Sequence, residues 1–129
     1  MSLDKSRKTR DYLYGRLLAI ADNLEQWALK ESGENRQTNA ARLMQRFSDH
    51  PFTTWRTIEL ALAPYKARLG PRSNKLQSVI DAVMSLFVPE EFSNDKALSG
   101  EFLLGYHSQR EALRLQNTES VVEAPVVAS

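Results

Sequence analysis

Apolar side chains recur every three or four residues along almost the whole chain, and this spacing restricts the possible folds more than any other feature. Side chains at such intervals share one face of an α-helix, whereas a half-buried strand would need strict alternation. The clearest stripe lies between residues 11 and 30 and consists of Leu13, Leu17, Ile20, Leu24 and Trp27 with Ala28. Only the short pairs Val121-Val122 and Val126-Val127 suggest strand, and Pro125 separates them. The chain is therefore predicted to be all-α.

Glycine and proline divide the helical spacing into segments. Gly33 ends the first stripe, Pro51 suits the first turn of a helix, and Pro64 and Pro89 interrupt the stripes before them. We expect helices over about residues 11–30, 38–47, 51–63, 73–87 and 93–113, with a further turn over 65–69. A chain of 129 residues suits one domain. The prediction is a compact bundle of about five helices with short loops over residues 11–116, between a basic lead (1–10) and a disordered tail (117–129).

Two glycines, Gly15 and Gly105, lie inside helical stripes, where glycine costs about 1 kcal/mol relative to alanine. Each is flanked by aromatic residues in the sequence. A position without a side chain lets a second backbone approach closely. We therefore predict that the first and last helices of the bundle cross at these two glycines.

The charges of the chain are segregated, although the formal net charge is only +1. Between Arg36 and Lys75, eight basic residues accompany two acids, Asp49 and Glu59, which makes this segment +6. Residues 1–16 carry +3, residues 17–35 carry −3, and residues 76–129 carry −5. Arginine makes up 11 of the 17 basic residues, which favours bidentate phosphate contacts. The segment suits a polyanionic partner, and a solvated face with salt bridges is the alternative.

The spacing of the basic residues groups some of them. Arg42 and Arg46 are four residues apart, so on one helix they would lie on the same face, one turn apart. Three others cluster around the turn expected at Gly70-Pro71: Arg68, Arg72 and Lys75.

No motif in the chain predicts catalysis, a cofactor or a metal. His50 and His107 are the two histidines, and neither has a second ligand at a spacing such as H-E-x-x-H. The adjacent acids Glu90 and Glu91 follow a proline and suit a solvated loop. The chain has no nucleophile elbow and no glycine-rich phosphate loop. We therefore expect a protein that is not an enzyme.

The composition favours the cytoplasm. The chain contains no cysteine, which suits a reducing compartment. No apolar run approaches the roughly 20 residues that a membrane span needs. The N-terminus has charge but lacks the apolar region of a secretory signal, so we expect no membrane association and a cytoplasmic protein.

Two stretches carry a family resemblance: Tyr12-Leu13-Tyr14-Gly15-Arg16-Leu17-Leu18-Ala19 and Phe102-Leu103-Leu104-Gly105-Tyr106-His107-Ser108-Gln109-Arg110. Together they resemble the C-terminal region of the large subunit of type I-C CRISPR Cascade complexes, over about residues 11–114. The second stretch departs from the family pattern, because His107 and Ser108 stand where a second aromatic residue would follow Tyr106. A free-standing chain of this region is similar to the separately translated small subunit of such complexes.

The resemblance implies a non-catalytic helical subunit that is present in more than one copy. It would contact the large subunit, the crRNA-binding backbone subunits and further copies of itself, and hold the displaced non-target DNA strand. DNA cleavage would belong to a separately recruited helicase-nuclease. The phosphate contacts expected on this basis are Arg42, Arg46, Arg68, Arg72 and Lys75, together with Arg36 and Arg56. Trp55 is expected in the core, and a stacking platform for bases is the alternative. The alternative is a protein-interaction module that scaffolds partner subunits without touching nucleic acid.

Overall fold

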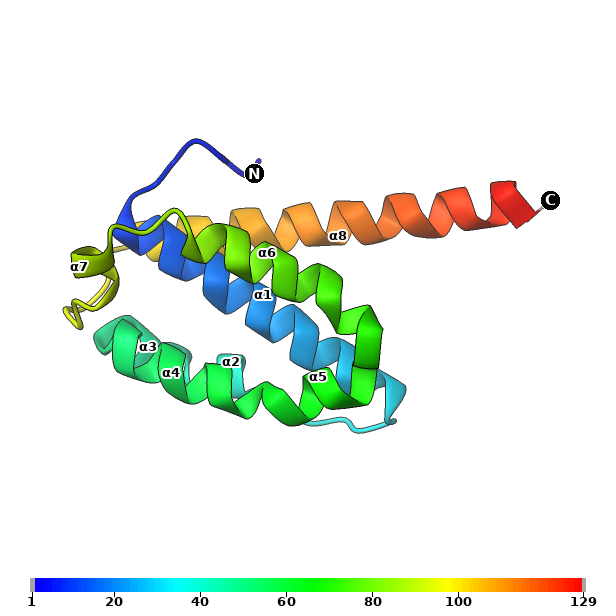
Figure 1. Cartoon of the computed structure of the whole chain (residues 1–129), viewed down its shortest axis with the longest axis horizontal. Helices are drawn as coiled ribbons and strands as arrows, with labels where there is room; N and C mark the ends of the chain where they lie inside the picture. The colour runs from blue at the N-terminus through cyan, green and yellow to red at the C-terminus, as the bar shows by residue number, and fades with distance from the viewer. Residues whose placement is uncertain (1, 129) are drawn as a thin grey trace.

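The centre of the molecule is the helix that the clearest apolar stripe predicts. In the computed structural model, which describes the backbone of residues 2–128 and the side chains of residues 2–115, this helix is α1 (Arg10–Glu31). Every side chain from residue 12 to residue 22 is buried, so α1 has no solvent-exposed face over three turns. A helix that is covered on all sides is typical of the middle of a bundle. Figure 1 shows α1 running between the other helices.

The remaining helices of the described residues surround α1 on two sides (Figure 1). One side holds α2 (Asn39–Arg42), α3 (Met44–Asp49), α4 (Pro51–Ala61) and α5 (Ala63–Leu69). The other holds α6 (Asn74–Met84) and α8 (Glu101–Ala128), while a 3-10 helix, η1 (Gly70–Ser73), and the short α7 (Pro89–Phe92) lie in the connections. Because the described residues form helices and no strand, the prediction of an all-α bundle with short loops is confirmed.

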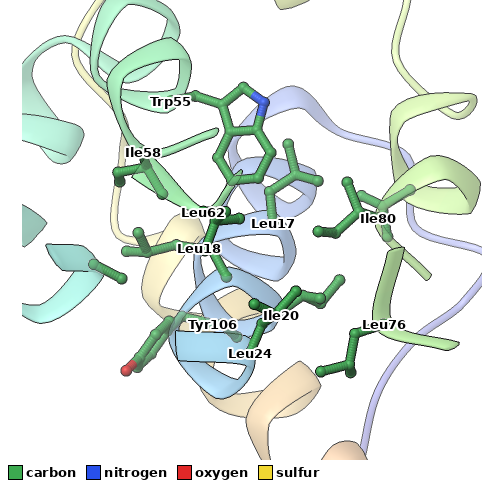
Figure 2. Packing of buried hydrophobic residues seen from close by; sticks show 14 of the residues in the cluster. Leu17, Leu18, Ile20, Leu24, Trp55, Ile58, Leu62, Leu76, Ile80 and Tyr106 are labelled. Carbon is green, nitrogen blue, oxygen red and sulfur yellow. The ribbon is translucent and has the colours of Figure 1, made fainter. Parts of the chain in front are cut away.

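The core lies along both sides of α1. Figure 2 shows Leu17, Leu18, Ile20 and Leu24 of α1 packed with residues of three further helices: Trp55, Ile58 and Leu62 from the α4 side, Leu76 and Ile80 from α6, and Tyr106 from α8. Each large apolar side chain that is fully buried contributes roughly 1.5–3 kcal/mol. Trp55 is completely buried, as the sequence predicts.

The most extensive contact between two helices is that of α1 with α8, and the two predicted glycines lie at their crossing. A Cβ atom placed on Gly15 would overlap the carbonyl oxygen of Phe102 and lie 2.7 Å from the amide nitrogen of Tyr106. A Cβ atom placed on Gly105 would overlap the carbonyl oxygen of Tyr12. The two backbones therefore touch at reciprocal glycines, and the predicted crossing is confirmed.

Chain breakers define several helix ends as expected. Gly33 follows the last residues of α1 with a φ of 71°, a left-handed conformation that glycine adopts without strain. Pro51 occupies the first turn of α4. Pro64 falls at the start of α5, so the helix preceding it ends at Ala61.

Two helix predictions were wrong in detail. The helix expected over 38–47 is divided, because Leu43 leaves the α conformation (φ −98°, ψ 9°) and separates α2 from α3. The last helix begins at Glu101 instead of near Ser93. Residues 93–100 are irregular because their polar groups contact other elements: Asp95 accepts hydrogen bonds from the amide (3.1 Å) and hydroxyl (2.9 Å) of Thr53. The amide of Leu98 donates to the carbonyl of Ser48 at 2.7 Å.

The backbone of α8 continues beyond the bundle as far as Ala128 (Figure 1). The side chains of residues 116–129 lie outside the described part of the chain. The disordered tail expected over residues 117–129 therefore stays a prediction. Within the described residues, no helix has the length and apolarity to cross a membrane.

Candidate nucleic-acid interface

All seven basic positions predicted from the sequence are exposed. They are distributed over the connection after α1 and six helical elements: Arg36 in the connection, Arg42 in α2, Arg46 in α3, Arg56 in α4, Arg68 in α5, Arg72 in η1 and Lys75 in α6. Their contacts divide them into three groups.

The first group, here named the paired set, consists of Arg36, Arg68 and Arg72. Arg68 Nη1 lies 2.5 Å from a carboxylate oxygen of Glu34. Arg72 Nη1 lies 2.5 and 2.8 Å from the two carboxylate oxygens of Glu31. These contacts place Glu31, the last residue of α1, and Glu34, in the connection after it, directly against the arginines of η1 and α5.

The third member of the paired set connects to the buried polar groups of the fold. Arg36 Nη1 lies 3.1 Å from a carboxylate oxygen of Glu25, and Arg36 also hydrogen-bonds the hydroxyl of Tyr65. Burial opposes the charge of Arg36, but Tyr65 and Glu25 outweigh that effect and raise the pKa of its guanidinium. The positive charge at this end of the molecule is therefore partly neutralised by the chain itself.

The second group, the unpaired set, consists of Arg42, Arg46 and Arg56 on the α2–α4 side of the bundle. Within the part of the chain that the structure describes, none of the three forms an ion pair. Arg42 Nη2 donates a single hydrogen bond, to Asn39 Oδ1 at 2.9 Å. Two acids, Asp49 and Glu59, lie on the same helices and also form no ion pair in the described residues. These guanidinium groups are free to contact an external anion.

The division of the second helix changes how two members of the unpaired set are related. Arg42 is the last residue of α2 and Arg46 belongs to α3, so the expectation that they share one continuous helix face was wrong. The cause is Leu43, which is buried in the core and takes a non-helical conformation between them.

Lys75 forms a group of its own. It lies on α6, on the other side of α1 from α2 to α4 (Figure 1), and it lines a pocket with Arg16. The seven predicted positions therefore do not all belong to one side of the bundle.

Aromatic rings accompany the arginines, a feature that sequence reasoning missed. The guanidinium carbons of Arg36 and Arg68 lie 5.5 and 5.3 Å from the ring centre of Tyr65. Arg72 lies 5.7 Å from the ring centre of Trp27, and Arg56 lies 5.7 Å from that of Phe52. Such cation–π contacts hold a guanidinium in place while leaving N–H donors available.

Part of this arrangement could have been predicted from the sequence. Tyr65 and Arg68 are three residues apart, and Phe52 and Arg56 are four apart, which are the spacings of neighbours on a helix surface. The contact of Arg72 with Trp27 joins residues far apart in the sequence, so it depends on the tertiary packing of η1 against α1.

The two histidines are not part of a metal site in the described residues, where no three potential ligands converge. His50 Nδ1 lies 3.4 Å from a carboxylate oxygen of Asp95. Partial burial opposes ionisation of Asp95, but the hydrogen bonds from Thr53 and the nearby His50 outweigh it and hold the pKa of Asp95 below its ordinary value. His107 is exposed and packs edge-on against Tyr106.

A helical bundle with exposed arginines has the hydrogen-bond donors that contact nucleic-acid phosphates, and its partly or fully buried rings hold several of these guanidinium groups in place. Comparison with known families gives a match over residues 1–114 to the family described as CRISPR-associated protein (Cas_Csd1). The match covers most of the chain, so this protein belongs to that family and is a CRISPR-associated protein of the Cascade type. Proteins of this kind work within multi-subunit complexes. A comparison with curated proteins gave no match.

Proposed function

We propose that this protein is the small subunit of a type I-C Cascade complex and acts in the cytoplasm. In this role it is not an enzyme: it stabilises the R-loop by holding the displaced non-target DNA strand against its basic side chains. The proposal is carried by the unpaired set, three exposed arginines without ion-pair partners in the described residues of a CRISPR-associated protein. Partners in this role are the large subunit, the crRNA-binding backbone subunits and further copies of this chain.

The energetics of R-loop formation suit such a role. Exchanging a DNA duplex for an RNA–DNA heteroduplex is nearly balanced, so modest contacts to the freed strand shift the equilibrium. Each phosphate contact releases bound counterions, and single-strand affinity then falls with log salt at a slope of about −0.7 per contact. Three arginine contacts would thus account for a slope of about −2.

The two sets of arginines are expected to contribute unequally. The unpaired set meets a phosphate without giving up an existing ion pair. The paired set has to share its donors with Glu25, Glu31 and Glu34, whose carboxylates also repel a phosphate. Exposed ion pairs contribute only about 0–1 kcal/mol, so this competition lowers the contribution of the paired set without abolishing it.

The test is R-loop formation by the assembled complex containing the triple variant Arg42→Ala, Arg46→Ala, Arg56→Ala. The expected result is a lower R-loop yield at physiological salt. The slope of log affinity against log salt concentration should also become shallower by about 2. The matched control removes the same charge from exposed lysines outside the Arg36–Lys75 segment: Lys8→Ala, Lys30→Ala and Lys96→Ala. Equal behaviour of the two triple variants would contradict the proposal.

A second function has its own supporting observation. Leu60 on α4 is 78% exposed, the highest value among the large apolar side chains of the described residues, and it lies four residues from Arg56. This favours the alternative in which α4 docks on a partner subunit and the charges serve only docking. In that case Leu60→Ser and the arginine variant would both reduce incorporation into the complex, whereas complexes that retained the subunit would form R-loops normally.

A further inference from the structure

A pocket on the far side of α1 from the unpaired set carries chemistry that DNA binding does not use. It has a volume of about 600 Å³ and lies between α1, α6, α8 and the N-terminal segment. Three of its lining side chains are cations, Lys5, Arg16 and Lys75, and none of the lining residues that the structure describes is acidic. Its size is within the usual range of ligand pockets.

Arg16 is the unusual residue of this pocket. Its side chain is 94% buried, and its Nε donates a hydrogen bond to Gln109 Oε1 at 2.7 Å. Its Nη1 is also buried and has no hydrogen-bond partner among the described residues. Burial lowers the pKa of Arg16, in keeping with a charge that has lost water without gaining a counter-ion. Such an uncompensated donor is costly, so the fold alone does not account for it.

The other buried charges of the fold provide the contrast. Asp22 accepts a hydrogen bond from the hydroxyl of Thr38. Glu25 faces Arg36 and accepts a hydrogen bond from the amide of Asn39 at 2.9 Å. Both buried acids have partners within the chain, whereas the partner of Arg16 among the described residues is a neutral amide. The described residues therefore supply no counter-ion for Arg16.

We infer that this pocket binds a carboxylate group carried by a partner protein, with Arg16 and Lys75 as its cationic contacts. The chemistry of the lining favours a carboxylate over a nucleic-acid phosphate. Apolar side chains, among them Val79 and Leu113, suit the methylene groups of an acidic side chain or the backbone end of a peptide. The described part of the lining contains no aromatic ring on which a base could stack.

This inference does not depend on DNA binding. It gives Lys75 a role on the α6 side of the bundle, separate from the phosphate contact that the sequence predicts. A molecule with one side for the displaced strand and a pocket for an acidic residue on the other would be held in its complex while it contacts DNA.

The experiment follows the full chain by NMR during titration at constant ionic strength. Two probes distinguish a side-chain carboxylate of the partner from its C-terminal carboxylate. N-acetylglutamate α-amide presents a side-chain carboxylate, and N-acetylalanine presents a C-terminal one. Dimethyl phosphate represents the nucleic-acid backbone. With a carboxylate probe we expect saturable shifts of the Arg16 Nε–H signal and of the Val79 and Leu113 methyl signals. The probe that binds more tightly shows which kind of carboxylate the pocket prefers.

Two variants test the assignment. The double variant Arg16→Met, Gln109→Leu removes both partners of the buried hydrogen bond, so neither polar group is left buried without a partner. In this variant the saturable shifts of the methyl signals should disappear. Lys75→Ala, at an exposed position, should weaken binding about two- to fivefold without affecting folding. The matched control, Arg110→Met, alters an exposed arginine of α8 and should bind normally.

Three results would overturn the inference. Absence of saturable shifts with both carboxylate probes would exclude a carboxylate site. Tighter binding of dimethyl phosphate would assign the pocket to nucleic acid. Unchanged affinity after Lys75→Ala would remove the cationic basis of the site even if the double variant failed to fold. None of these results bears on the unpaired set, so the proposed R-loop function would stand or fall separately.

Discussion

At the crossing of α1 and α8, two single residues determine how closely the helices approach. Gly15 lies against the backbone of Phe102 and Tyr106, and Gly105 lies against the backbone of Tyr12. Backbone atoms cannot rotate away as a flexible side chain can, so any added methyl group has to separate the helices. The sequence contained this information, because a glycine inside an apolar helical stripe is costly unless close packing compensates for it.

We expect Gly15→Ala and Gly105→Ala each to destabilise the protein by about 1–3 kcal/mol through overpacking. The sign is informative, because alanine alone would stabilise a helix interior by about 1 kcal/mol. The measurement is the free energy of unfolding by urea denaturation. Gly100→Ala is the control, since a Cβ atom there meets nothing within 4 Å and its stability should change little. A neutral effect at both Gly15 and Gly105 would contradict the close crossing.

At the scale of whole elements, the apolar spacing predicted the helices well but not their interruptions. The stripe of α1 was clear, and its burial on all sides follows from packing that spacing alone does not reveal. The break at Leu43 and the irregular segment 93–100 were missed for a common reason. In both, contacts with distant elements override local helix preference: Leu43 is buried in the core, and Asp95 bonds the start of α4.

Asp95 acts as a helix cap supplied by a segment distant in the sequence. Its carboxylate accepts hydrogen bonds from the amide and hydroxyl of Thr53, in the first turn of α4. Removing such a cap typically costs about 1 kcal/mol, so we expect Asp95→Ala to lower the free energy of unfolding by that amount. Glu90→Ala, an exposed acid of α7, is the control and should have almost no effect. If Asp95→Ala and Glu90→Ala lowered the free energy of unfolding equally, Asp95 would not be acting as a cap.

The charge of Asp95 should also make the folding stability depend on pH. Folding lowers the pKa of Asp95, so the stability that its charge contributes is present above the unfolded pKa, near 4, and is lost as the pH falls through the folded pKa. We expect the stability difference between the wild type and Asp95→Asn to be largest near neutral pH and to vanish in acid. Denaturation curves at several pH values measure it, and a difference that persisted at pH 2 would show that the charge is not responsible.

At the scale of the whole molecule, the segregated charges of the sequence become three separate surfaces. The acids at the end of α1 face the arginines of α5 and η1, the unpaired set occupies α2 to α4, and Lys75 joins the pocket beside Arg16. Sequence reasoning located the basic segment and its arginine content. It could not divide the segment, because Glu31 and Glu34 meet Arg72 and Arg68 only through the packing of helices distant in the sequence.

Glu31, the last residue of α1, and Glu34, three residues beyond it, occupy donors of Arg72 and Arg68 that a phosphate would need. If Arg68 and Arg72 contact phosphates, then Glu31→Gln with Glu34→Gln frees both guanidinium groups and removes two repelling charges. We expect tighter binding of a labelled oligo(dT) strand and a salt slope steeper by about 1.4, the value for two additional contacts. Fluorescence anisotropy between 50 and 200 mM salt measures both quantities.

The control for this pair has to separate a local effect from a general change in charge. Glu90→Gln with Glu91→Gln removes the same two charges from exposed positions on α7 and frees no arginine in the described residues. A general electrostatic effect would raise the affinity of both double variants equally, because the whole-molecule charge changes by the same amount. Only a contact of Arg68 and Arg72 with the strand would make the Glu31→Gln, Glu34→Gln variant bind more tightly than the Glu90→Gln, Glu91→Gln variant. Equal affinities would restrict the DNA contact to the unpaired set.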